Sequence, residues 1–355
     1  MATINFGIAG PMYGDLSAYG YNVRAGANLA VKHINSRGGI HGRMIATKLF
    51  DEAMMPRAAE KMVQDGIRYV VGHQCSWGVD MASEVYEKKG VILISPAATS
   101  PELARLGRRY FFRTVGTDTA QAAAACDWIV GNIRPGVKIA VLYEATLLHL
   151  ATSVKQGLEG RGFEVAPFEF LRASFREASE IVEWLQQNGV GFVYWAGDAT
   201  MITWLKKAAR AARFKARFMG SDDATILGED SSGPDFLEGL LVTSPVNFRH
   251  VPNPKHQQLA LEMEELAKQN DRDPRPCISP LAFLTYSAVE VLAQAIEAAG
   301  DCDDVEEVAQ ALRSGTFETP VGSISFDEHG DLKTSEKTSE FIVEECHAGR
   351  PKTRA

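Results

Sequence analysis

The 355-residue chain lacks the features that mark several classes of protein. Its five cysteines form no CxxC pair, so the sequence indicates neither a zinc site nor a dithiol redox motif. No apolar run reaches the ~18–20 residues that a membrane span needs, so we expect no direct membrane insertion. Met1-Ala2-Thr3 leads into an apolar segment with no basic or apolar leader, so we expect either a cytosolic protein or a chain that begins at a mature N-terminus.

An excess of basic charge is also absent. The 37 Lys and Arg residues are outnumbered by 45 Asp and Glu residues, which gives a net charge of −8. A protein whose main partner is nucleic acid needs clustered basic residues, so we expect no nucleic-acid partner. The local basic runs at residues 105–109 and 206–217 alternate with apolar positions and are typical of solvated helix faces or turns.

What the sequence does contain is an alternation of short apolar strands and helical segments, in two series. In the first series we expect strands at residues 4–9, 44–50, 68–71, 91–94 and 110–114, and helices at 23–34, 57–65, 79–89 and 118–130. In the second we expect strands at 138–143, 164–170, 191–196 and 217–220, and helices at 153–161, 177–187 and 200–212. Short, continuously apolar strands are typical of parallel strands covered by helices on both faces. The sequence therefore predicts an α/β protein with two doubly wound, Rossmann-like lobes.

The last third of the chain breaks this alternation. We expect a strand at 240–243, helices at 254–269, 280–299 and 308–312, and strand-like segments at 317–326 and 341–343. These pieces hold too few strands for a third domain, so we expect them to return to the two lobes and complete them. The predicted division is residues 1–118 with 250–327 for the N-terminal lobe, and 119–249 with 328–355 for the C-terminal lobe.

The sequence offers little support for a cofactor, a metal or a catalytic centre. The first expected strand and the turn after it contain Gly7, Gly10 and Gly14, but these do not spell the dinucleotide-binding motif G-x-G-x-x-G. Pro11 also interrupts this turn, although Asp51 lies where a ribose-binding acid would be. The histidines are scattered without the i, i+3 or i, i+4 spacing of metal ligands. We therefore expect no cofactor, no metal and no catalytic residue.

Polar and small residues gather where the expected strands end. Ligands bind at this edge of open α/β sheets. The segments are residues 72–76, 95–100 and 116–118 in the first series, and 197–198 and 220–223 in the second. Hydroxyls, backbone N–H groups and helix N-termini on the first lobe suit a carboxylate, and carboxylates on the second suit an ammonium. A zwitterion held between the lobes would satisfy both, although each polar residue could instead cap the helix that follows it.

Several motifs resemble the leucine/isoleucine/valine-binding protein family, the type I periplasmic binding proteins of amino-acid ABC importers. The most specific is Pro96-Ala97-Ala98-Thr99-Ser100-Pro101-Glu102-Leu103. The others lie at residues 38–43, 67–76, 218–220, 238–243 and 326–333. The resemblance spans nearly the whole chain. It implies two lobes joined by three crossovers, hinge closure on the ligand, an ABC importer as partner, a monomer, and a periplasmic location for a mature form without its signal peptide.

The resemblance also implies roles for particular residues. Ser76 and Thr99 match the hydroxyls that hold the ligand α-carboxylate, with the backbone at Ala97 and Ala98 beside them. Asp222 matches the acid that receives the α-ammonium, and Asp118 matches an acid near it. Tyr19 matches an aromatic residue that lines the side-chain pocket. The expected function is a receptor for a small amino acid, with the branched-chain or aliphatic class favoured.

Four departures from the family pattern concern the pocket. Trp77 follows Ser76 where the family commonly has a small residue, and Leu148 lies in a segment that replaces a pocket tyrosine. Asp198 stands where branched-chain binders often carry a tyrosine. This acid either favours a cationic or hydrogen-bonding ligand group or caps the following helix. Met54 replaces the cysteine that usually pairs with the position of Cys75, so that disulfide cannot form.

Three other readings stay open at the level of sequence. The same fold could bind a small amide, urea or another carboxylate such as an aromatic acid. A cytosolic ligand-responsive regulator could use the same scaffold. An α/β enzyme could use Asp222-Asp223, or Cys75 with His73 two residues away.

Overall fold

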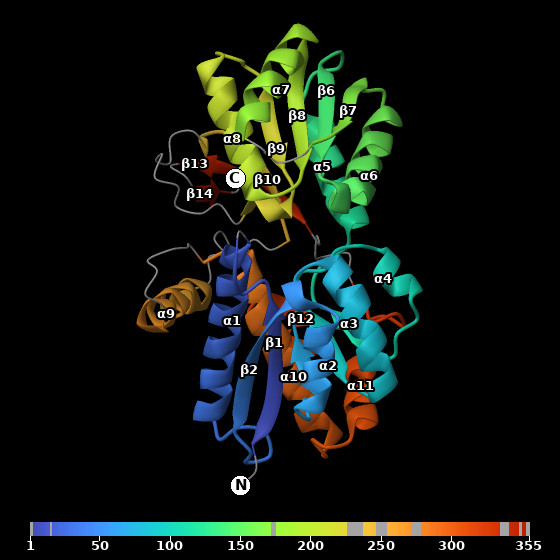
Figure 1. The fold of residues 1–355 in the computed structure, drawn as a ribbon, viewed down its shortest axis with the longest axis vertical. Coiled ribbons are helices and arrows are strands. Elements are labelled where there is room, and N and C mark those ends of the chain that lie inside the picture. The colour runs from blue at the N-terminus through green and yellow to red at the C-terminus, as the bar shows by residue number, and fades with distance from the viewer. Residues whose placement is uncertain are drawn as a thin grey trace. The chain divides into compact units, whose positions relative to one another are not determined.

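The computed structural model describes residues 3–14, 16–171, 175–225, 237–245, 254–270, 278–333, 341–347 and 350–352 (Figure 1). The chain divides into two compact units. The first comprises residues 1–117 and 251–339, and the second comprises residues 118–250 and 340–355. Both are α/β, as the sequence predicts.

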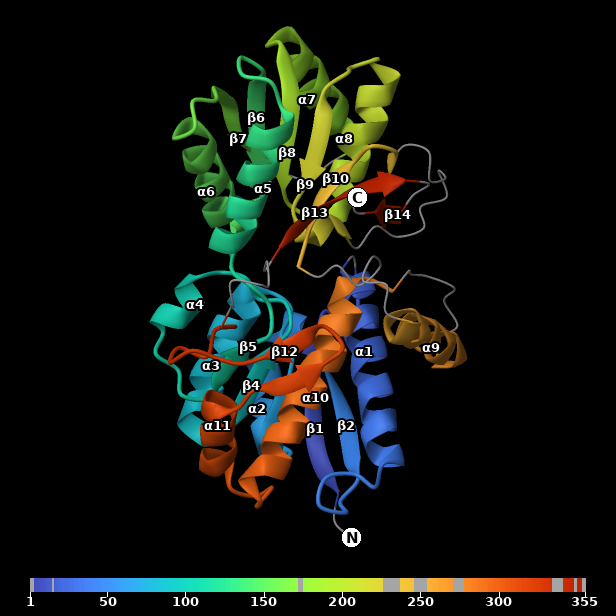
Figure 2. The ribbon, with the colours of Figure 1, turned by 180° about the vertical axis from the view of Figure 1, so that it is seen from behind.

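The first unit is built on a five-stranded parallel sheet. Its strands are β1 (Ile4–Gly10), β2 (Ile45–Asp51), β3 (Tyr69–Val71), β4 (Ile92–Ser95) and β5 (Phe111–Arg113), in the order β2-β1-β3-β4-β5. Its helices are α1 (Ser17–Ser36), α2 (Arg57–Gln64), α3 (Ser76–Lys89), α4 (Glu102–Arg105), α9 (Pro254–Asn270), α10 (Pro280–Ala299) and α11 (Val305–Ser314). Helices α2 and α3 cover one face of the sheet (Figure 1), and α10 and α11 cover the other (Figure 2).

Helix α10 supplies much of the core of the first unit. Pro280 occupies its first turn, where the missing N–H costs nothing. The helix packs along α1 and against β3 and β4, and 16 of its 20 residues are buried. Its length and composition would also suffice for a membrane span, but its apolar surface is already covered by the sheet and by α1.

The second unit contains a seven-stranded mixed sheet. Its strands are β6 (Lys138–Tyr143), β7 (Val165–Phe170), β8 (Val190–Ala196), β9 (Arg217–Gly220), β10 (Leu241–Ser244), β13 (Ile342–His347) and β14 (Arg350–Lys352), in the order β14-β13-β10-β9-β8-β6-β7. Strands β6 to β10 are parallel, whereas β13 and β14 are antiparallel to their neighbours. Its helices are α5 (Asp118–Asn132), α6 (Leu148–Glu159), α7 (Phe175–Gln187) and α8 (Ala199–Ala211).

Strand β8 shows why this sheet is apolar on both faces. Phe192 and Tyr194 point into the core that α5 and α6 cover. Val193 and Trp195 alternate with them and point into the core that α7 and α8 cover. Figures 1 and 2 show these helix pairs on opposite faces of the sheet. Period-two alternation therefore places apolar residues on both sides, which accounts for the continuous apolar run in the sequence.

The structure corrects the expected division of the chain near its end. The sequence-based boundary after residue 327 places residues 328–333 in the C-terminal lobe, but they belong to the first unit. The cause is Arg113, whose guanidinium is fully buried and donates two hydrogen bonds to Asp331, at 2.8 and 2.7 Å. The backbone N–H of Arg113 also donates to the carbonyl of Gly330 at 2.9 Å.

Other segments differ from expectation in extent. Residues 317–326 form a hairpin, β11 (Phe317–Thr319) with β12 (Gly322–Ile324), because Gly322 adopts a φ of +115° in the turn. Strand β14 gives no apolar run and was not expected. Helix α6 begins at Leu148 rather than at residue 153.

The Arg113–Asp331 pair gives a stability prediction. Asp331→Ala leaves a buried guanidinium without its carboxylate, so we expect the free energy of unfolding to fall by about 3–5 kcal/mol in urea denaturation. The control is Glu159→Ala, which removes a carboxylate from the more exposed Lys155–Glu159 pair and should cost at most about 0.5 kcal/mol. Equal losses in the two variants would contradict the assigned importance of the buried pair.

Candidate ligand-binding site

In the first unit, two loops at the carboxyl edge of the sheet carry the predicted carboxylate-binding residues. Ser76 is the first residue of α3, directly after the loop that follows β3. Ala97, Ala98 and Thr99 lie in the loop that follows β4, and Thr99 is buried. The backbone N–H of Ser100 donates to Ser76 Oγ at 3.2 Å. Because β3 and β4 are adjacent and parallel, the structure brings these residues together.

Buried polar side chains hold the loop after β4 in place through hydrogen bonds to its backbone. Arg113 Nη1 donates to the carbonyls of Ala98 and Ser100, at 3.1 and 2.8 Å. Ser95 Oγ accepts from the backbone N–H of Ala98 at 3.0 Å and donates to the carbonyl of His73 at 2.8 Å. Arg113 was not predicted from the sequence as a residue that supports the site. A charged residue inside an otherwise apolar strand could have indicated it, because a buried charge requires a buried partner.

The two aromatic candidates of the first unit differ in exposure. Tyr19 lies in the first turn of α1, after β1, and is buried. Trp77, the second residue of α3, is 43% exposed. Both follow strands that neighbour each other in the sheet, so they lie at the same edge as Ser76. Their roles in lining a ligand pocket stay predictions.

In the second unit, one of the candidate ammonium-binding acids, Asp222, is held by a glutamine of the helix that begins at the other, Asp118. Asp118 is the first residue of α5 and is buried, and Asp222 begins the 3-10 turn Asp222–Thr225 after β9. Gln121, one turn into α5, donates through Nε2 to Asp222 Oδ1 and to Thr243 Oγ1, both at 2.7 Å. Asp118 and Asp222 are therefore close enough for the charge of Asp118 to raise the pKa of Asp222. Gln121 was not predicted as a site residue.

Asp198 is a helix cap in this structure. Its Oδ1 accepts from the backbone N–H of Met201 at 2.9 Å, at the N-terminus of α8. The side chain is half-buried, and its backbone N–H lies 3.5 Å from Glu144 Oε1. Leu148, by contrast, is exposed at the start of α6, four residues beyond Glu144.

Several acidic side chains lie close together at the carboxyl edge of the sheet in the second unit. Burial raises the pKa of Asp222 to about 6, partly offset by the hydrogen bond from Gln121. Burial and the charge of Asp198 raise the pKa of Glu144 to about 7. Burial and the charges of Asp222, Glu144, Asp198 and Asp118 raise the pKa of Asp223 well above its ordinary value. Mutual repulsion of this kind is relieved by a cation, so this half of the site favours a positively charged ligand group.

The alternative of a Cys75–His73 nucleophile finds no support in the geometry. His73 is fully buried, and its Nε2 contacts Tyr86 Oη at 3.2 Å rather than the Cys75 thiol. Burial also lowers the pKa of His73 to about 3. Cys75 Sγ instead donates to Gln74 Oε1 at 3.2 Å. In the described residues, Cys75, Cys126, Cys302 and Cys346 form no disulfide.

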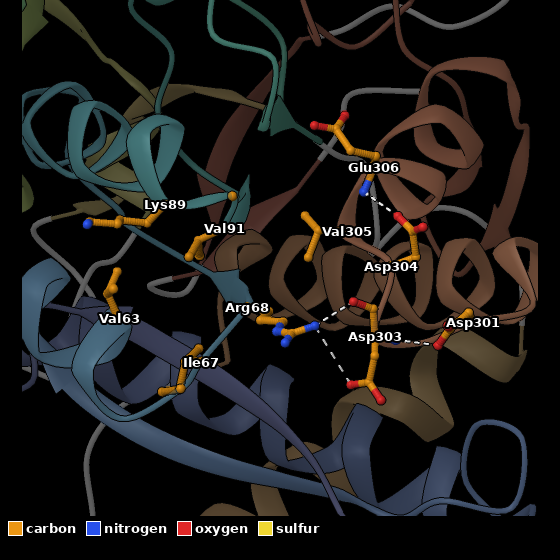
Figure 3. A pocket seen from close by; sticks show the side chains of 12 residues that line it. Val63, Ile67, Arg68, Lys89, Val91, Asp301, Asp303, Asp304, Val305 and Glu306 are labelled. Atoms are coloured by element: carbon orange, nitrogen blue, oxygen red, sulfur yellow. Dashed lines mark hydrogen bonds and ion pairs between the residues drawn. The ribbon is translucent and has the colours of Figure 1, made fainter.

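A charged cavity lies at the opposite edge of the first sheet (Figure 3). Arg68 and Val91, which directly precede β3 and β4, line it together with the segment 301–306. Arg68 Nη1 donates to the carbonyl of Asp303, so its charge is directed at this segment. Asp301, Cys302 and Asp303 place three potential metal ligands together, but Arg43 Nη1 already contacts Cys302 Sγ at 2.7 Å and Asp303 at 3.2 Å.

Comparison with known proteins agrees with the fold. A family described as periplasmic binding protein matches residues 3–335. The leucine-, isoleucine-, valine-, threonine- and alanine-binding protein of Pseudomonas aeruginosa is 37% identical, covering 99% of this chain and 92% of that protein. The Leu/Ile/Val-binding protein of Escherichia coli K12 is 32% identical, covering 99% and 93%. A leucine-binding protein structure from Thermotoga maritima superposes with a TM-score of 0.82 at 23% identity, covering 99% and 98%.

The two doubly wound units therefore have the type I periplasmic binding protein fold. The chain belongs to the periplasmic binding protein family. The resemblance drawn from the sequence motifs is confirmed.

The capping role of Asp198 gives a second prediction. Asp198→Ala removes the acceptor for the Met201 N–H, so we expect a loss of about 1 kcal/mol in the free energy of unfolding. Asp198→Asn retains a capping acceptor and should lose only a few tenths of a kcal/mol. Urea denaturation at pH 7 measures both. The capping assignment is wrong if the two variants lose equal stability.

Proposed function

We propose that the protein is a solute-binding receptor that captures a small α-amino acid, with the branched-chain or aliphatic class favoured, and delivers it to an ABC importer. The proposal is supported by relatives at 32–37% identity whose names specify leucine, isoleucine and valine. The observation that carries it is the complementary chemistry of two half-sites, hydrogen-bond donors on the first unit and carboxylates on the second.

The first half-site is suited to the ligand α-carboxylate. Ser76 stands at the N-terminus of α3, where unpaired N–H groups and the helix dipole favour an anion. The hydroxyl of Thr99 and the backbone of Ala97 provide further polar groups on the adjacent loop, whereas the backbone N–H and carbonyl of Ala98 are already bound by Ser95 and Arg113. Donors aimed at a carboxylate form charge-assisted bonds, which are stronger than neutral ones.

The second half-site is suited to the α-ammonium. We assign Asp222 as its main acceptor, because its carboxylate follows β9 at the carboxyl edge of the sheet and is held there by the hydrogen bond from Gln121. Asp118 adds negative charge beside it. An ammonium placed here would offset the repulsion that raises the pKa values of these acids.

Capture follows from a ligand that contacts both half-sites. Such a ligand stabilises the arrangement of the units in which both sets of contacts form, so its binding favours hinge closure. The role requires only a monomer. We also propose that the protein acts in the periplasm, as its family name implies.

A thermal-shift panel tests this function directly. We expect L-leucine, L-isoleucine or L-valine to raise the melting temperature, because a ligand that binds only the folded state stabilises it. The panel holds the twenty amino acids, small amides, urea and benzoate. A response confined to amides, urea or benzoate would replace the amino acid with one of those ligands. No response to any of them would reject the receptor role for these ligand classes.

The assignment of Asp222 gives a further prediction. Asp222→Asn keeps the shape of the residue but removes its charge, so L-leucine should bind at least about tenfold more weakly at pH 7.5. Because the pKa of Asp222 is raised to about 6, wild-type affinity should fall as the pH drops through 6, when this carboxylate is protonated. Calorimetric titration measures both effects, with Glu164→Gln on the exposed edge as control. Unchanged affinity in Asp222→Asn would remove this residue from the site.

A further inference from the structure

Glu52 is a buried acid directly behind the first half-site. It begins the short 3-10 turn Glu52–Met54 after β2, and it is 1% exposed. Its Oε2 accepts from the backbone N–H of Gln74 at 2.8 Å, and its Oε1 lies 3.4 Å from the backbone nitrogen of Cys75. A Cβ added at Gly78 would lie 3.3 Å from Oε2, so the carboxyl group packs against the first turn of α3.

These contacts fix the backbone that leads into Ser76. The loop begins at Gly72, whose φ of +135° and close approach to the carbonyl of Ala9 leave no room for a side chain. Glu52 then accepts hydrogen bonds from the backbone N–H groups of residues 74 and 75. The resemblance places a disulfide between the same two segments, and Met54 precludes it. In this protein, the hydrogen bonds that Glu52 accepts connect those two segments.

His73 lies next to Glu52 with one ring nitrogen unsatisfied. Tyr86 Oη donates to Met62 Sδ at 3.0 Å, and His73 Nε2 lies 3.2 Å from the same oxygen. The single proton of Tyr86 Oη lies within reach of both Met62 Sδ and His73 Nε2, so these contacts are compatible with either neutral tautomer of His73. His73 Nδ1 is buried and has no hydrogen-bond partner among the described residues. It faces Glu52 Oε2 at 3.7 Å.

A carboxyl group buried beside a neutral imidazole is favoured in its protonated form, because burial penalises the charged carboxylate. Burial raises the pKa of Glu52 to about 7, although the backbone N–H of Gln74 and the thiol and backbone N–H of Cys75 lower it, and burial lowers the pKa of His73 to about 3. The proton therefore resides on Glu52. The titratable groups that face Glu52 are Asp51 on its own segment, and His73 and Cys75 from the loop into α3.

We propose that Glu52 and His73 form a buried proton-holding pair that positions Ser76, and that binding of the ligand carboxylate is coupled to the proton on Glu52. The coupling rests on the proposed function. An ionised Glu52 places negative charge behind the helix N-terminus that receives the ligand carboxylate, whereas a protonated Glu52 does not. Affinity should therefore fall as the pH rises through 7, opposite to the effect of Asp222.

The binding experiment titrates L-leucine calorimetrically between pH 5.5 and 8.5. We expect the wild-type affinity to fall about tenfold between pH 6.5 and 8.5, as expected when a group titrates within this window. Glu52→Gln keeps the acceptor for the Gln74 N–H but cannot ionise, so the alkaline fall should vanish while the acidic fall from Asp222 stays. Glu60→Gln, which alters an exposed acid on α2 outside the candidate site, should behave as wild type. An alkaline fall of equal size in Glu52→Gln overturns the proposal.

A second measurement tests the proposal on the wild type alone. At pH 8, the wild-type binding enthalpy should vary with the ionisation enthalpy of the buffer and give an uptake of up to about one proton per ligand. No uptake at any pH between 7 and 8.5 overturns the coupling.

In the absence of ligand, a folded-state pKa raised from 4.5 to about 7 means that stability is lost as the pH rises from about 4.5 to about 7. The melting temperature of the wild type should therefore fall by a few degrees relative to Glu52→Gln between pH 5 and 7.5, whereas Glu60→Gln should follow the wild type. Parallel curves overturn the proton-holding pair. Failure of L-leucine to bind at any pH would reject the proposed function and the coupling to it, while the ligand-free comparison still decides whether Glu52 holds the proton.

Discussion

Parallel strand pairing is the constraint on which the rest of the molecule depends. In a parallel sheet every strand ends at the same edge, so residues far apart in the chain are delivered to one place. In the first unit this brings the residues after β3 and β4 into hydrogen-bonding contact. In the second it places Asp222, after β9, beside the strand-end segment that holds Asp198, after β8.

The candidate binding residues are held in place by polar groups buried behind them. Arg113 donates hydrogen bonds both to the loop after β4 and to Asp331. Glu52, at the end of β2, accepts a hydrogen bond from the loop after β3, and Gln121 of α5 donates one to Asp222. Each of these residues satisfies backbone or carboxylate groups that burial would otherwise leave unpaired, which is costly. The two edges differ in charge because of their own side chains. The first carries the hydroxyls of Ser76 and Thr99, and the second carries the carboxylates of Asp198, Asp222 and Asp223.

The fold was largely predictable because apolar runs and glycine-terminated helices carry a strong local signal. The expected strands at 138–143 and 217–220 and the helix at 280–299 match the structure residue for residue. The candidate residues at the strand ends followed from topology and from the P-A-A-T-x-P-E-L block. The supporting residues could not be found in the same way. Arg113, Glu52 and Gln121 act through partners between 13 and 218 positions away in sequence, which no local pattern records. Asp198 could be a cap or a ligand residue by sequence, and only its contact with Met201 shows that it caps α8.

The discontinuity of the first unit has a consequence for its synthesis on the ribosome. All five strands of its sheet have been made by residue 113, yet the face that α10 covers stays open until residues 280–299 have emerged. The second unit is translated almost in full during this interval. The nascent chain therefore carries an uncovered apolar sheet through the synthesis of a whole neighbouring domain, which is the condition under which a chaperone bound to the emerging polypeptide protects it from aggregation.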